Sequence, residues 1–132
     1  MNFRFLGWVT LVLLVVMISP FILRLLHSKV FKSKSKGLLK VIKGLRAIHK
    51  PLGLALVLLG AVHGIGMLGR VRLHTGSLVL MSLILTGVLG VAFWKKKDKR
   101  ALMDHRVMSL VTVILLLLHL FWPGALFRLF GI

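Results

Sequence analysis

The chain has 132 residues, of which 58% are hydrophobic, and its mean hydropathy is +1.00. This composition is too apolar for a soluble domain of that length, so we expect a single membrane domain. The chain has 19 Lys and Arg but only two acids. It has no cysteine, which excludes disulfides and thiolate metal sites. Long apolar runs between the charges argue against nucleic-acid binding.

Four apolar segments are long enough to cross a hydrocarbon core about 30 Å thick. They are residues 5–26, 49–68, 76–94 and 105–122. The first is longer than the core of a signal peptide and lacks a small-residue cleavage site, so we expect it to be retained. The sequence therefore predicts an all-α, integral membrane four-helix bundle with antiparallel neighbours, in which residues 1–132 form one domain within the lipid bilayer.

Basic segments separate the spans, and we expect residues 27–48 and 95–104 to be loops on the cytoplasmic side. Apolar residues recur at helical spacing over 38–50, with basic residues between them. This pattern is typical of a short amphipathic helix on an anionic membrane surface, or of a solvated extension of the second span. The short turn at 69–75 requires the second and third spans to be antiparallel.

The distribution of cations predicts the orientation of the chain. Residues 24–50 hold nine Lys and Arg and residues 95–106 hold six, whereas the opposite side holds four. Because cytoplasmic loops carry the excess of basic residues, both termini are expected on the non-cytoplasmic side. The second and fourth spans then run parallel. We expect a multi-pass protein of a bacterial or archaeal cytoplasmic membrane.

Two spans each carry a pair of histidines fourteen residues apart, His49 with His63 and His105 with His119. Fourteen residues turn a helix by about 1400°, roughly 40° short of four turns, so both members of a pair share a face. They are separated by about 21 Å along the helix, which is too far for a single metal ion. Because the spans are parallel, each depth holds one histidine from each span.

Two imidazoles that face each other can be the axial ligands of a haem iron. We therefore expect two haem b groups, the inner one held by His49 and His105 and the outer one by His63 and His119. Polar residues inside spans are costly and usually functional. The alternative role for these histidines is hydrogen bonding between helices. His27 and His74 have no such partner and are expected at the interface, where His74 could also lie near the outer haem.

Small residues on the same helix faces support this interpretation. Gly53 and Gly60 share the histidine face of the second span and would let a flat macrocycle approach the backbone. Ser109 and Thr112 are the matching small residues of the fourth span. Close packing of helices is the alternative explanation for the glycines.

Haem propionates are anionic, so charge complementarity predicts basic partners near each haem. These partners are Arg46, Lys50 and Arg106 for the inner haem, and Arg70 and Arg72 for the outer one. The same cations also have the topological role described above.

Three stretches carry a resemblance to a known family: Ile48-His49-Lys50-Pro51-Leu52-Gly53-Leu54 with the apolar run to His63-Gly64, Thr75-Gly76-Ser77, and Asp104-His105-Arg106 with the run to His119-Leu120-Phe121-Trp122. Over residues 46–122 the chain resembles the ferric reductase-like transmembrane family, whose haem-bearing domain is shared with NADPH oxidases. The resemblance implies that the four paired histidines are haem ligands. Family members often have six spans. No strand and Gly-rich loop for a flavin or nicotinamide cofactor is present here.

Together these features predict a dihaem b-type cytochrome that carries electrons across the membrane. The donor would be a cytoplasmic-side protein or a quinol, and the acceptor would lie on the other side. No catalytic residue is expected, and whether the chain is the membrane subunit of a reductase stays open. The alternative is a haem-free small cationic membrane anchor or a pore-forming bundle, in which the histidines donate hydrogen bonds between helices.

Overall fold

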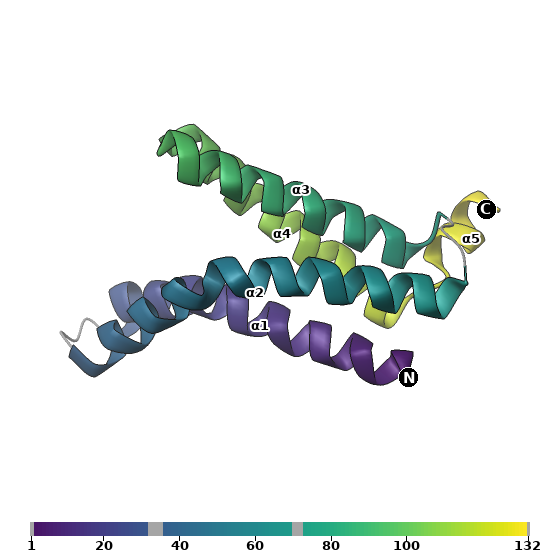
Figure 1. Cartoon of the computed structure of the whole chain (residues 1–132), viewed down its shortest axis with the longest axis horizontal. Coiled ribbons are helices and arrows are strands. Elements are labelled where there is room, and N and C mark those ends of the chain that lie inside the picture. Colours follow the sequence, from purple (N-terminus) through teal and green to yellow (C-terminus); the bar gives the residue numbers. More distant parts are fainter. Residues whose placement is uncertain (1, 32–35, 70–72, 132) are drawn as a thin grey trace. The chain divides into compact units, whose positions relative to one another are not determined.

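The structure is a computed structural model that describes residues 2–31, 36–69 and 73–131, and it contains no strand within these ranges. Its elements are α1 (Phe3–Leu26), the π-helical turn η1 (His27–Phe31), α2 (Lys36–Leu68), α3 (Thr75–Lys96), α4 (Lys99–Phe121) and α5 (Ala125–Phe130) (Figure 1). The helices α1 to α4 are each long and apolar enough to cross a membrane. The predicted all-α fold with four membrane spans is therefore confirmed, and the chain is a multi-pass integral membrane protein.

The distribution of side chains suits a lipid environment. Large apolar residues are exposed on the long helices, for example Leu54 at 65% and Leu110 at 62%, whereas the polar residues Thr75, Ser82 and Thr112 are buried. Lipid tails solvate apolar side chains as well as a protein core does, so the helices have little need to bury them against one another. Polar side chains gain more from the protein interior, where they find hydrogen-bond partners.

The chain divides into two compact units, residues 1–59 and 60–132. The helix α2 belongs partly to each of them. The side of the membrane on which the termini lie stays a prediction.

In the first unit, α1 continues through a proline. Pro20 has no N–H with which to bond the carbonyl of Val16, one turn earlier. The hydroxyl of Ser19 donates to that carbonyl at 2.6 Å, so the acceptor stays satisfied. At the start of the helix, the Asn2 side chain accepts hydrogen bonds from the N–H groups of Arg4 and Phe5.

The helix α2 is continuous over 33 residues and includes Pro51. At 1.5 Å per residue it is about 50 Å long, well beyond the thickness of the hydrocarbon core. Residues 38–50 are therefore a helical extension of the second span. Within the first unit α2 runs antiparallel to α1, since Gly53 lies against Met17 while Arg46 lines a pocket with Arg24.

In the second unit, α3 and α4 pack closely as an antiparallel pair (Figure 1). Only Lys97 and Asp98 separate them. Lys97 adopts a left-handed conformation with φ 52° and ends α3 by donating its N–H to the carbonyl of Phe93. The Asp98 side chain accepts from the N–H of Arg100 and caps α4. The fourth helix thus begins at Lys99, ahead of the predicted start at 105, and most of the predicted 95–104 loop is helical.

Candidate functional site

The ring of His105 on α4 is held against the backbone of α3. Its Nδ1 lies 2.9 Å from the carbonyl oxygen of Thr86. A carbonyl only accepts, so we assign the proton to Nδ1, and the neutral ring keeps its lone pair on Nε2. Gly90, one turn after Thr86, leaves the necessary space: a Cβ there would lie 3.1 Å from Cε1 and 3.2 Å from Nδ1 of His105.

The ring of His119 is held by α3 in a similar way. Its Nδ1 lies 3.0 Å from the hydroxyl oxygen of Thr75, a residue only 1% exposed. That hydroxyl donates its one hydrogen to the carbonyl of Pro123 at 2.8 Å, so it accepts from Nδ1 of His119. Nε2 again keeps the lone pair. Here Gly76 makes the space, because a Cβ there would lie 3.1 Å from Cε1 of His119.

The two arrangements repeat at equal intervals. Gly76 and Gly90 are fourteen residues apart on α3, as His105 and His119 are on α4, and the helices are antiparallel. Between these points the hydroxyls of Thr86 and Thr112 lie 3.1 Å apart. Gly76, Gly90, Thr75 and Thr86 were not among the site residues predicted from the sequence. The signal that could have found the glycines is their spacing, which equals that of the histidines.

Two further histidines of the second unit lie near His119. The rings of His74 and His119 are in edge contact with centroids 6.0 Å apart, and His63 is close enough for its charge to act on the His119 ring. His74 caps α3: its backbone N–H donates to the Ser77 hydroxyl at 2.9 Å. The members of the predicted outer pair, His63 and His119, therefore belong to one neighbourhood.

The predicted inner pair is divided between the two units, with His49 in the first and His105 in the second. Its pairing stays a prediction. The predicted glycines of α2 contact neighbouring helices: a Cβ on Gly53 would lie 3.3 Å from Met17, and one on Gly60 would lie 3.7 Å from Leu80. These contacts are the close helix packing that the sequence left open as an alternative.

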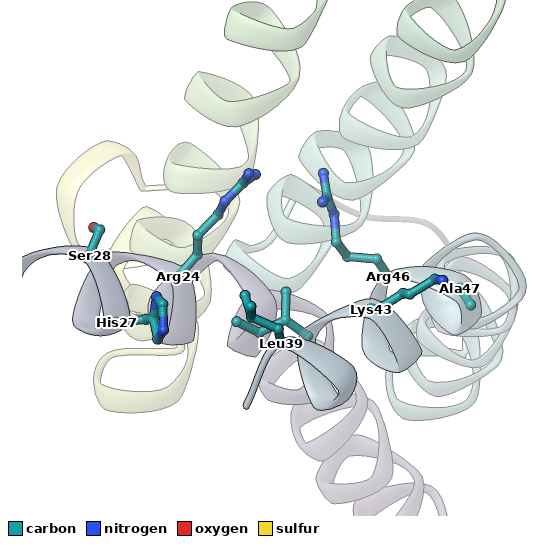
Figure 2. Close-up of a pocket in the computed structure, with 8 residues that line it drawn as sticks. Arg24, His27, Ser28, Leu39, Lys43, Arg46 and Ala47 are labelled. Carbon is teal, nitrogen blue, oxygen red and sulfur yellow. The ribbon is translucent and has the colours of Figure 1, made fainter. Parts of the chain in front are cut away.

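Three of the five predicted propionate partners belong to the described residues, and two do not. Arg46, Lys50 and Arg106 have exposed side chains. Arg46 also lines a pocket of the first unit, where it extends toward the same side as Arg24 (Figure 2). Arg70 and Arg72 lie outside the described residues.

The donors that the structure describes on α4 are two imidazoles, His105 and His119. Within the described ranges, no three or more His, Asp, Glu or Cys residues form a group able to hold a metal ion. Axial haem ligation needs only two histidines, and metal-binding histidines commonly donate the other ring N–H to a protein acceptor. His105 and His119 both have that acceptor.

Comparisons of the chain with known protein families, curated proteins and solved structures find no match.

Proposed function

We propose that this chain is a dihaem b-type cytochrome that carries electrons across a membrane, similar to the membrane domain of the ferric reductase-like family. The repeated arrangement on α3 and α4 carries the proposal. At two points fourteen residues apart, a histidine of α4 lies against a glycine of α3 with Nδ1 in a hydrogen bond. Such a bond orients the ring and raises the basicity of Nε2, the atom that would bind iron.

The chain would hold two haems at two depths in the membrane, one at the level of His63 and His119 and one at the level of His49 and His105. His63 and His119, which both belong to the second unit, would hold the outer haem. His49 and His105 would hold the inner one. When bound, haem supplies one-electron redox chemistry. Thr75 and the carbonyl of Thr86 keep the α4 rings oriented. The cations near each level would offset the negative propionates: Arg46, Lys50 and Arg106 inside, Arg70 and Arg72 outside.

The two levels suit transfer across a bilayer. They are about 21 Å apart along α4, which covers most of a hydrocarbon core about 30 Å thick. With both termini on the non-cytoplasmic side, as the positive-inside distribution favours, the His49–His105 level lies near the cytoplasm. A quinol or a cytoplasmic-side redox protein would then be the donor, and the acceptor would lie on the opposite side.

The proposal is tested by the absorption spectrum and the haem-to-protein ratio of protein purified from haem-replete cells. We expect a b-type α band in the reduced-minus-oxidised spectrum and two haems per chain. His63→Ala should remove one haem and leave the other. His27→Ala is the matched control and should retain both. A folded protein without the α band would contradict the proposal, and loss of both haems in His63→Ala would contradict the pairing.

One observation favours the second candidate, a haem-free cationic anchor or pore-forming bundle. The Nδ1–H of His105 donates to a carbonyl of the neighbouring helix, which is the role that this candidate gives the histidines. In that case His105→Asn, which can keep a donor near Thr86, should leave the fold intact. The absorption spectrum should not change, because the protein would have no haem band to lose. A haem protein would lose its inner haem with the same substitution.

A further inference from the structure

The first unit contains a pocket of about 700 Å³ between the end of α1 with its π-helical turn and the first half of α2. This volume lies within the range of sites that bind small molecules, roughly 300–1,000 Å³. All its lining residues belong to the first unit, and none is a member of the fourteen-residue histidine pairs.

The polar part of the lining is cationic. Arg24 comes from α1, and Lys43 and Arg46 come from α2. Figure 2 shows the side chains of Arg24 and Arg46 extending from their two helices toward the same side of the pocket. Three like charges on one pocket repel one another, so an anion between them would stabilise the arrangement.

The sequence supplies no such anion to this unit. Residues 1–59 contain ten Lys and Arg, while the two acids of the chain, Asp98 and Asp104, both belong to the second unit. The first unit therefore has no carboxylate of its own that could balance Arg24, Lys43 and Arg46.

A buried polar atom at the same pocket also points to a ligand. His27 lines the pocket, and its Nε2 is buried without a hydrogen-bond partner among the described residues. Leaving a buried polar group unpaired is energetically costly. A ligand oxygen would pair with this nitrogen. The hydroxyl of Ser28, which donates to the carbonyl of Leu25 at 3.1 Å, still has lone pairs for a ligand or water.

The remaining lining is apolar. Leu39 contributes its side chain, and Ile42, only 6% exposed, is also part of the wall. The pocket includes residues at the end of the first candidate span, Phe3–Lys29, where lipid headgroups meet acyl chains. A free phosphate ion would need the cations alone, whereas a phospholipid needs both the cations and the apolar wall.

From these observations we propose that the pocket lined by Arg24, His27, Lys43 and Arg46 binds the phosphate group of an anionic phospholipid. The cations and His27 contact the phosphate oxygens, and Leu39 and Ile42 contact the start of the acyl chains. The lipid thereby holds the end of α1 against α2.

The test is a titration of the purified full chain in detergent, with bound species counted by native mass spectrometry. The probes are phosphatidylglycerol, phosphatidylcholine with the same acyl chains, and inorganic phosphate. We expect tight binding of phosphatidylglycerol only. Arg24→Gln with Lys43→Gln should weaken it roughly tenfold or more, since each basic residue near a membrane surface contributes about 1 kcal/mol.

The matched control, Lys99→Gln with Arg100→Gln, removes the same charge from exposed positions of α4 and should leave binding unchanged. Lys43→Arg keeps the charge and should also retain binding. Binding by this variant would show that a substitution at position 43 does not by itself prevent folding. Equal loss in the pocket and control variants would overturn the proposal, as would equal binding of phosphatidylcholine or of inorganic phosphate.

The lipid proposal shares only Arg46 with the proposed haem site, where Arg46 would be a propionate partner. Phosphatidylglycerol should therefore still bind to preparations with haem, through Arg24, His27 and Lys43. Binding that disappears on loading with haem would overturn it, because the cations would then serve the propionates.

Discussion

The α3–α4 pair of the second unit and the α1–α2 pair of the first are both antiparallel, yet different side chains lie between their helices. Between α3 and α4, hydrogen bonds join His119 to Thr75 and His105 to the backbone of Thr86. In the first unit, the hydroxyls of Thr10 and Ser19 bond carbonyls of their own helix, and Gly53 lies against the flexible end of Met17.

This difference shows two ways to pair helices in lipid. Directional hydrogen bonds between α3 and α4 favour one register, because their geometry is lost when the helices slide past one another. A methionine against a glycine tolerates small shifts, since its side chain is unbranched and adaptable. The first unit also leaves a charged pocket at one end of its pair, so another molecule can complete the contact.

The largest effect is expected from a bulky residue at the closest histidine contact. Gly90→Leu places side-chain atoms where the His105 ring lies, so it should destabilise the α3–α4 pair by about 1–3 kcal/mol and abolish binding of the proposed inner haem. Thermal unfolding and haem content measure both effects. Gly87→Leu is the control, because a Cβ at Gly87 meets nothing within 4 Å. Equal damage by both variants would mean that the His105 contact is unimportant.

Next in size is the loss of the Thr75 hydroxyl. Thr75→Val leaves His119 Nδ1 and the carbonyl of Pro123 without this partner, so the affinity for the proposed outer haem should fall about 10–100-fold. A haem titration followed by absorbance measures the affinity. Thr10→Val removes a hydroxyl that bonds only within α1 at 2.7 Å, and it should have no effect on haem. Unchanged affinity in Thr75→Val would show that this hydroxyl does not support the ligand.

The same small substitution in the two units tests the comparison directly. A Cβ at Gly76 meets a hydrogen-bonded ring at 3.1 Å, whereas one at Gly53 meets the movable Met17 methyl at 3.3 Å. Gly76→Ala should therefore destabilise by about 1 kcal/mol. Gly53→Ala should be neutral or slightly stabilising, because alanine favours the helix by up to about 1 kcal/mol. Thermal unfolding that ranks the two variants in the opposite order would contradict this account.

The smallest effect is expected at the midpoint of the α3–α4 contact. Thr112→Val removes the hydroxyl 3.1 Å from that of Thr86, and interhelical hydrogen bonds in membranes average about 0.6 kcal/mol. Denaturant titration in detergent can resolve this change. Ser109→Ala, which removes a hydroxyl bonded to the carbonyl of its own helix, should change stability less. A cost well above 1 kcal/mol for Thr112→Val would indicate a polar network larger than this pair.

The four spans could be predicted because hydropathy is a local property of each segment. Their ends were less predictable. The capping side chain of Asp98 starts α4 at Lys99, before the apolar run begins, and α2 continues through Pro51 to join the basic stretch to the span. A proline in a helix removes one hydrogen bond, and the remaining bonds of α2 are enough to keep the helix continuous.

The histidine pairs were visible in the sequence because they repeat within one helix. The hydrogen-bond partners that α3 provides for these histidines were not visible in the sequence, since they depend on the register between two helices. Nothing local to Thr75 or Thr86 indicates that a hydroxyl or a carbonyl will meet an imidazole forty-four or nineteen positions away. Only the packing of α3 on α4 brings these groups together.

The equal spacing of Gly76 and Gly90 with His119 and His105 has a consequence for assembly. If α3 slid by one helical turn, about 5.4 Å, both glycine–histidine contacts would be lost together. When one glycine–histidine contact forms, the other is therefore already aligned. A hairpin of α3 and α4 in a shifted register makes neither contact. Insertion of this helical hairpin should thus end in one sharply defined alignment, which α3 and α4 reach in a single cooperative step.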